Sequence, residues 1–178
     1  MILSDSAILA ALEKGDIVIE PFDRAHLGSN SYDVHLSPHV AMYEAEVLDA
    51  RTHNRVHRFT IPPEGFVLRP GELYLGSTVE YTESHRHLPI LDGKSSVGRL
   101  GIDIHATAGI GDVGFCGHWT LELSVSKPVR VYAGMPIGQI VYYRVEGEVL
   151  RPYHKKKDSK YSHQDCLPVE SMMWKNTF

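Results

Sequence analysis

The chain is poor in cysteine and contains no long apolar run. Its 178 residues include only two cysteines, Cys116 and Cys166, which are too few for a disulfide-built extracellular scaffold and favour a reducing compartment. No run of about 18 apolar residues occurs, and no basic segment followed by an apolar one opens the chain, so we expect neither a membrane span nor a secretory signal. The cytoplasm is the simplest expected location.

Two familiar motifs for phosphate and metal chemistry are missing as well. Gly93-Lys94-Ser95 resembles the end of a Walker A loop, but that motif requires a glycine where Leu88 stands. A zinc-dependent nucleobase deaminase carries a His-x-Glu and a Pro-Cys-x-x-Cys, and the chain has neither. We therefore expect no zinc and no metal ligands from the protein, and we interpret His105 as structural. A hydrolytic water would then have to be activated by a carboxylate or a histidine.

The composition indicates a single globular domain spanning residues 1–178. Hydrophobic residues make up 43% of the chain and charged residues 22%, which is ordinary for soluble domains, and the length allows a substantial core. The formal net charge of −4 does not indicate binding to nucleic acid. Any polyphosphate ligand would therefore have to meet cations that are clustered locally.

Secondary-structure signals predict one clear helix and many short strands. Ser4 can cap a helix that ends near Gly15, with Ile8 and Leu12 on one face, and a second short helix is expected near Ser95. Proline and glycine separate the short β-rich runs that follow, which is typical of an antiparallel sandwich or barrel rather than of βαβ units. The runs are Ile17–Ile19, Tyr32–Leu36, Phe66–Leu68, Tyr74–Thr78, Trp119–Val125, Val129–Tyr132 and Gln139–Val145.

The segment from Gly93 to Glu122 is chemically the richest part of the chain. It reads GKSSVGRLGIDIHATAGIGDVGFCGHWTLE. Its cations and hydroxyls suit a phosphate, and the carboxylates of Asp112 and Glu122 lie in different surroundings. Arg99 follows Ser95 by one helical turn, so we expect both side chains on one face. Such a set suits hydrolysis of a phosphorylated small molecule better than it suits packing alone.

Several ordered motifs resemble the dCTP deaminase family, whose relatives are the trimeric dUTPases. The core signature is GKSSVGRLG, the His105–Gly109 motif and Asp112-x-Gly-Phe-x-Gly-x-x-Thr-Leu-Glu122. Further resembling segments are Asn30–Leu36, Arg69–Gly71, Gly134–Gln139 and Arg151–Tyr153. The resemblance implies a mainly β fold, a distorted antiparallel dUTPase-like β-barrel with a short N-terminal helix and one further short helix. It also implies a homotrimer with active sites between subunits, and a C-terminal arm, 154–178, which we expect to be mobile.

The resemblance further implies zinc-independent deamination of dCTP to dUTP and ammonia, with Glu122, Ser95 and Arg99 as catalytic residues. Glu122 would take a proton from the water that attacks C4 of cytosine, protonate N3 and help ammonia to leave. Ser95 would orient that water together with a carbonyl near Ala108, and Arg99 would bind phosphate and polarise the site. From the residues alone, Glu122 could face solvent, Ser95 could cap a helix and Arg99 could be an ordinary surface residue.

A wider set is expected to bind the nucleotide. Asp112 would contact the deoxyribose side, although an aspartate in a Gly-rich turn often only stabilises the turn. Tyr153, Lys160 and Gln164 would reach the base or phosphates from the arm, for which the plain alternative is a disordered polar tail. Mg²⁺ should arrive with the triphosphate, and dTTP is a candidate inhibitor. The full predicted set is Lys94, Ser95, Ser96, Val97, Gly98, Arg99, Ala108, Asp112, Thr120, Leu121, Glu122, Gln139, Tyr153, Lys160 and Gln164.

The reaction product separates the alternatives. A bifunctional enzyme would also release pyrophosphate and form dUMP for thymidylate synthesis. Gly109 favours it slightly, because members that stop at dUTP often carry a bulky residue there, whereas glycine leaves room for a second water. In dUTPases the carboxylate equivalent to Asp112 helps to activate such a water, and Gly111 departs from the bulky aliphatic residue usual before it. A plain dUTPase and a catalytically silent nucleotide-binding barrel are further alternatives, against which the KSS-x-x-R arrangement and Glu122 argue.

Overall fold

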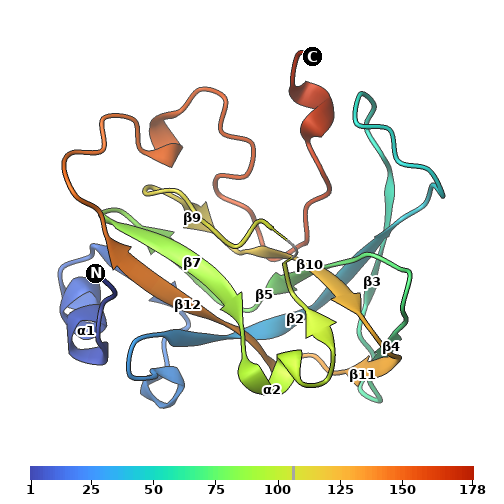
Figure 1. The fold of residues 1–178 in the computed structure, drawn as a ribbon, viewed down its shortest axis with the longest axis horizontal. Helices are drawn as coiled ribbons and strands as arrows, with labels where there is room; N and C mark the ends of the chain where they lie inside the picture. Colours follow the sequence, from blue (N-terminus) through green and yellow to red (C-terminus); the bar gives the residue numbers. More distant parts are fainter. Residues whose placement is uncertain (106) are drawn as a thin grey trace.

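The computed structural model describes residues 1–105 and 107–178, so Ala106 of the His105–Gly109 motif lies outside the described residues. The fold is mainly β (Figure 1), as predicted. Its helices are α1 (Asp5–Glu13), α2 (Ser95–Gly98) and the short 3-10 turns η1 (Arg24–His26), η2 (Tyr153–Lys155) and η3 (Met173–Lys175). Within these residues, no helix combines the length and the apolar character needed to cross a bilayer.

The strands are short and closely spaced along the chain. They are β1 (Ile17–Glu20), β2 (Tyr32–Tyr43), β3 (Val56–Thr60), β4 (Phe66–Leu68), β5 (Tyr74–Thr78), β6 (Tyr81–Ser84), β7 (His87–Gly93), β8 (Ile102–Asp103), β9 (Cys116–Gly117), β10 (Thr120–Val125), β11 (Val129–Val131) and β12 (Pro136–Arg144). The predicted bounds of β4 and β5 are confirmed. Strand β2 continues beyond its predicted end at Leu36, and β12 begins before Gln139 and ends one residue before the predicted Val145.

Helix α1 forms where the capping signals predict it. The Ser4 side chain accepts a hydrogen bond from the Ala7 N–H at 3.4 Å. Gly15 follows the helix with a φ of 69°, a left-handed conformation that glycine adopts at little cost. Ile8 is fully buried, whereas Leu12 on the predicted face is half-buried, so the helix packs mainly through Ile8.

The strands pair antiparallel in three sheets that form a nearly closed barrel (Figure 1). The largest has the order β7-β12-β2-β5-β10-β8, with β3 added to β2; the others are β1-β6-β9 and β11-β4. Strand β2 pairs with both β12 and β5, and its register toward β5 shifts between Leu36 and Val40. Such irregularities increase local twist and bend, which helps the sheet to curve around a core containing the fully buried Tyr32 and Tyr142.

The C-terminal segment lies against the barrel beside β9 and β10 (Figure 1). Gln164 forms an isolated bridge with Gly117, and the His118 N–H donates to the Gln164 carbonyl at 3.1 Å. These contacts place the arm next to β10, which carries the predicted catalytic glutamate. The predicted mobility of residues 154–178 stays a prediction.

Candidate functional site

A cavity of about 600 Å³ opens between strand β10, the loop before β9 and the C-terminal arm. Its size lies within the range of roughly 300–1,000 Å³ usual for small-molecule sites. Aromatic walls come from Tyr43, Phe115, Trp119 and Tyr161, as expected for a site that receives a planar ring. The predicted substrate-binding residues that line it are Ala108, Asp112, Thr120, Glu122, Tyr153 and Gln164.

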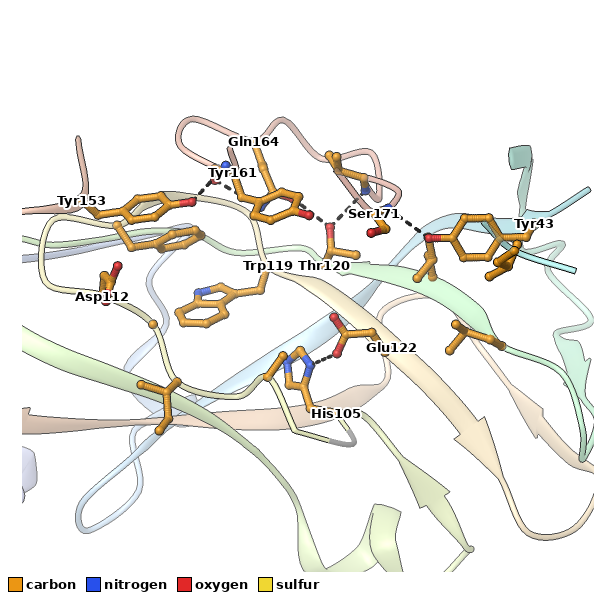
Figure 2. A pocket seen from close by; sticks show the side chains of 18 residues that line it. Tyr43, His105, Asp112, Trp119, Thr120, Glu122, Tyr153, Tyr161, Gln164 and Ser171 are labelled. Atoms are coloured by element: carbon orange, nitrogen blue, oxygen red, sulfur yellow. Dashed lines mark hydrogen bonds and ion pairs between the residues drawn. The ribbon is translucent and has the colours of Figure 1, made fainter. Parts of the chain in front are cut away.

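Glu122 and His105 meet inside this cavity (Figure 2). Strand β10 keeps Thr120, Glu122 and Ser124 half-buried on one face while the intervening residues are buried, as strand alternation predicts. The Glu122 carboxylate forms a short hydrogen bond with Nδ1 of His105. The Glu122 side chain is 35% exposed and that of His105 only 7%. The carboxylate therefore reaches the cavity while the buried imidazole supports it.

His105, which we interpreted from sequence as structural, lies in the cavity wall in contact with Glu122. Its Nε2 is buried and has no hydrogen-bond partner among the described residues, and its Nδ1 holds the predicted catalytic carboxylate of Glu122. A buried polar atom without a partner costs free energy. Because of its hydrogen bond to Glu122, the imidazole is a candidate positioning group for that carboxylate. The sequence did not reveal this pair, because no local spacing connects the two residues.

The arm closes the cavity through hydrogen bonds to β10 and among its own residues (Figure 2). Thr120 Oγ1 donates to Gln164 Oε1 at 2.8 Å and accepts from the Val169 N–H at 3.0 Å. The Tyr153 hydroxyl accepts from the Tyr161 N–H at 3.0 Å. The predicted positions of Tyr153 and Gln164 in the cavity wall are thus observed, and Tyr161 lines the cavity with them.

Tyr43 borders the other end of the cavity. Its hydroxyl accepts from the Ser171 N–H at 3.0 Å (Figure 2). Burial raises the pKa of Tyr43, and the hydrogen bond from Ser171 opposes that rise. The phenol therefore stays neutral at physiological pH and keeps a proton that it can donate to a ligand.

Asp112 lies apart from the Glu122–His105 pair, beside the arm (Figure 2). Its Oδ2 accepts from Nζ of Lys156 at 2.7 Å, and this Nζ lies 5.6 Å from the centre of the Tyr153 ring. The Asp112 side chain is 51% exposed and that of Lys156 33%, so the ion pair is accessible to solvent. Lys156 was missed from sequence because it belongs to a lysine run in which no spacing favours one member.

Close packing around Gly111 shapes the loop that carries Asp112. A Cβ atom at Gly111 would lie 2.5 Å from the Trp119 ring and 2.9 Å from Pro89. The Trp119 ring, which is buried, therefore occupies space that an aliphatic side chain at position 111 would need. The loop is accordingly supported by Trp119 at the point where the chain departs from the usual family residue.

Gly109 allows the backbone of its loop to approach the backbone of β7 closely. A Cβ atom there would lie 2.4 Å from the carbonyl oxygen of Leu91 on β7, and the Leu91 N–H donates to the Gly109 carbonyl at 2.8 Å. The missing side chain would point at the backbone of β7. Packing of the loop on β7 is thus one physical reason for this glycine, and the room it leaves for a second water stays a prediction.

The KSS segment faces a second cavity, of about 310 Å³. Lys94, Ser95 and Gly98 line it, and among the described residues His105 is the one that borders both cavities. Ser95 is exposed and is the first residue of α2, with Lys94 in the capping position. Arg99 is exposed as well. Within one chain, the structure does not bring Ser95 or Arg99 into the first cavity.

Other predicted residues near α2 and β10 differ in what they can offer a ligand. Val97 is 4% exposed and Leu121 is fully buried, so within one chain neither presents an accessible side chain to a ligand. Ser96 is exposed beside Ser95. Lys94 forms an ion pair with Asp33, which a phosphate would have to displace.

Two further predicted residues lie outside both cavities. Gln139 accepts from Ser31 Oγ at 2.9 Å and donates to the Gly93 carbonyl at 3.2 Å, so it joins β12 to the end of β7. Lys160 donates to Asn176 within the arm. Their predicted contacts with nucleotide stay predictions.

The first cavity contains two carboxylates that could meet a metal ion, Asp112 and Glu122. Among the described residues, the groups of three potential ligands lie elsewhere. Magnesium usually keeps several waters and binds one or two carboxylates together with substrate phosphates. The exposed Asp112 fits such a role, and arrival of Mg²⁺ with the triphosphate stays a prediction.

Comparisons with known proteins agree with the motifs. The dCTP deaminase-like family profile matches residues 2–145. A protein of Cytophaga hutchinsonii named dCTP deaminase, dUMP-forming, is 48% identical over 99% of this chain and 98% of its own length. A protein of Clostridium acetobutylicum with the same name shows the same identity and coverage.

A solved structure shows the same fold. The 2'-deoxycytidine 5'-triphosphate deaminase from Agrobacterium tumefaciens matches with a TM-score of 0.65 at 22% identity, over 84% of this chain and 50% of that longer chain. The barrel expected from sequence is thereby confirmed. On the family profile and on identities near one half over almost the whole length, this chain belongs to the dCTP deaminase family.

Proposed function

We propose that this protein hydrolyses dCTP to dUMP, releasing ammonia and pyrophosphate. The observation that carries the proposal is the Glu122–His105 pair inside an aromatic-walled cavity. Relatives that share almost the whole chain are named dUMP-forming dCTP deaminases, which favours the dUMP-forming alternative over a deaminase that stops at dUTP.

Deamination is the first step. Water adds to C4 of cytosine, and Glu122 accepts a proton from that water as the C–O bond forms. Glu122 passes that proton to N3. It then takes the remaining proton from the hydroxyl on C4 and delivers it to the amino group, which leaves as ammonia when the C4–N bond breaks and the C4 carbonyl forms. The hydrogen bond between His105 Nδ1 and Glu122 holds the carboxylate toward the ring during both transfers. Zinc has no place in this scheme.

Hydrolysis of the phosphoanhydride is the second step. A second water attacks the α-phosphorus, the bond to the bridging oxygen of pyrophosphate breaks, and dUMP remains. Asp112 is the carboxylate available to activate this water. Lys156, bonded to Asp112 at 2.7 Å, would move its charge to the phosphates when Mg²⁺ and the nucleotide enter.

A homotrimer would complete the site. Ser95 and Arg99 are exposed beside the second cavity, whereas Glu122 lies in the first. Leu100 and Ile110 are 53% and 68% exposed near these two groups, as expected of surfaces that pack on another chain. We propose that Ser95 and Arg99 of one subunit reach the Glu122 cavity of its neighbour. dTTP, which shares the deoxyribose and triphosphate, would inhibit by occupying the same cavity.

One assay tests the function directly. The protein is freed of transition metals, supplied with Mg²⁺, and given dCTP or dUTP in separate reactions, while ammonia, pyrophosphate and nucleotides are measured. We expect dUMP and pyrophosphate from either substrate, ammonia from dCTP only, and little free dUTP. Absence of ammonia from dCTP would refute the proposal, and dUTP as the sole product of dCTP would refute its second step.

A matched pair of variants assigns the two steps. Asp112→Asn should stop pyrophosphate release while ammonia release continues, so that dUTP accumulates. Lys156→Met, which removes the partner charge but keeps Asp112, should retain both products at a lower rate. Ammonia and pyrophosphate lost together in Asp112→Asn would mean that Asp112 serves nucleotide binding and not the second water.

A further inference from the structure

A third cavity, of about 540 Å³, lies between the segment that precedes β2 and the turn between β5 and β6. It shares no lining residue with the two cavities described above. His26, His35 and Glu80 border it, and they come from η1, from β2 and from the residue just before β6. Three separate parts of the chain thus place nitrogen and carboxylate ligands around one hollow.

Glu80 is held rigidly at the base of this group. Its side chain is 3% exposed. Oε2 accepts from the His35 backbone N–H at 2.8 Å, and Oε1 bonds Nδ1 of His35 at 2.6 Å. Among the described residues, both hydrogen bonds of this buried carboxylate run to His35, so the carboxylate lies directly beside that ring.

His26 brings the third ligand from the more exposed side. Its ring centre lies 4.3 Å from that of His35. Among the described residues, no hydrogen bond engages the ring nitrogens of His26. One ligand atom from each of His26, His35 and Glu80 lies within 4.8 Å of the others. In a tetrahedral zinc site with bonds of about 2.0–2.2 Å, ligand atoms are about 3.3–3.6 Å apart. To reach these separations, His26 must move closer on its short η1 turn, and the 2.6 Å contact between His35 Nδ1 and Glu80 Oε1 must open by about 1 Å.

We propose that His26, His35 and Glu80 bind a divalent transition metal, with zinc as the best-suited ion. Two imidazoles and one carboxylate form a known zinc ligand set, which water completes from the cavity. The metal would take the place of the proton between His35 Nδ1 and Glu80 Oε1, while the His35 backbone N–H keeps Oε2 in place. From sequence we expected no metal ligands, because no spacing links these residues; the proposal departs from that expectation.

A second group of three potential ligands can be compared with the group formed by His26, His35 and Glu80. Glu83, His85 and Cys116 also lie within 4.8 Å of one another. Burial raises the pKa of the Cys116 thiol, and the Glu83 charge raises it further, whereas a metal needs the thiolate. His85 already bonds Glu83 at 2.7 Å on the surface. This group therefore serves as the matched control for the first.

The proposed metal would be structural and separate from catalysis. It would join η1 to β2 and to the start of β6. A ligand that binds only the folded chain raises its stability. Zinc should therefore raise the melting temperature without changing ammonia release from dCTP.

Zinc titration of the full, tag-free and metal-stripped chain tests the proposal. Calorimetry with Zn²⁺ and the visible absorption of bound Co²⁺ report affinity and ligand set, and circular dichroism checks that each variant is folded. We expect one Zn²⁺ to bind per chain. In His26→Ala and in Glu80→Gln the affinity for Zn²⁺ should be lower by about tenfold or more. His85→Ala should bind as the wild type does.

The outcomes are distinct. Loss of the zinc-induced rise in melting temperature in folded His26→Ala, with that rise intact in His85→Ala, supports the site. No saturable Zn²⁺ binding to the wild-type chain, equal binding in His26→Ala, or loss of binding in His85→Ala would overturn it. Because ammonia release is measured in parallel, failure of the metal site is distinguishable from failure of the proposed catalysis.

Discussion

The two cavities that meet at His105 differ in how far one chain completes them. On the Glu122 side, the arm covers the cavity: Thr120 donates a hydrogen bond to Gln164 and accepts one from the Val169 N–H. On the Ser95 side, the smaller cavity is bordered by exposed groups. In the trimer that we propose, one chain would build the pocket for base and sugar, and its KSS segment would serve the cavity of a neighbour.

The largest expected effect comes from removing the Glu122 carboxylate. In Glu122→Gln the amide keeps the shape but cannot accept a proton from water, so ammonia release should fall by at least roughly 10²–10⁴-fold. Binding of dCTP, measured by calorimetry, should change little. Ser124→Ala, on the same face of β10 but outside the cavity, is the control and should stay active. Ammonia release near the wild-type rate in Glu122→Gln would remove Glu122 from the mechanism.

Mixing two inactive variants tests whether the two cavities serve different chains. Glu122→Gln and Ser95→Ala should each be nearly inactive alone. If a site combines Glu122 of one chain with Ser95 of another, randomly mixed trimers regain about a quarter of their sites. Subunits are exchanged by mild denaturation and refolding, and ammonia release is then measured. No recovery in mixtures whose trimers are verified would show that each site uses residues of a single chain.

A smaller effect is expected at His105. His105→Ala should lower the turnover rate by roughly 10²-fold through loss of the Glu122 orientation, with the Michaelis constant little changed. His105→Asn can still donate a hydrogen bond from a position near Nδ1, so it should recover part of the rate. The pH–rate profile distinguishes a positioning role of His105 from a role in folding alone. Loss of a group in contact with Glu122 should shift the acidic limb of the profile, whereas loss of a purely structural group should not. Equal activity of the Ala variant and the wild type would leave His105 structural.

The smallest effect concerns the arm at low pH. Burial raises the pKa of Glu170, but hydrogen bonds from His53 and Arg58 outweigh it and lower the pKa below its ordinary value of 4.5. The resulting stabilisation is fully present above pH 4.5 and is lost as pH falls through the lower pKa of the folded state. The protection of the Ser171 and Met172 amides against hydrogen exchange, after correction for the intrinsic exchange rate, should therefore fall on acidification. Glu170→Gln should exchange faster already at pH 7 and lose this pH dependence; an unchanged profile would show that Glu170 does not anchor the arm.

Capping residues and strand alternation predicted those parts of the molecule that depend on residues adjacent in the sequence. Ser4 and Gly15 bound helix α1 as expected, and alternation along β10 places Thr120 and Glu122 on the cavity face. Strand β7 was missed because Pro89 lies in its middle. It pairs only with β12 in the main sheet, and such an edge position tolerates proline.

Contacts between distant segments were beyond the sequence signals. Nothing in the spacing of His105 and Glu122 reveals their hydrogen bond, and the lysine run does not single out Lys156 as the partner of Asp112. The separation of Ser95 from the Glu122 cavity also depends on how α2 packs. These features arise from tertiary packing, which periodicity and local motifs do not encode.

The Trp119 ring fills the space that a side chain at position 111 would need, and this has an evolutionary consequence. Because a side chain at position 111 would lie 2.5 Å from the indole, neither position can change freely while the other stays as it is. Lineages that acquire an aliphatic residue at 111 must have a smaller or displaced ring at 119, and those that keep the tryptophan must keep the glycine. The two positions should therefore covary among relatives, as a record of two alternative ways to fill the same space.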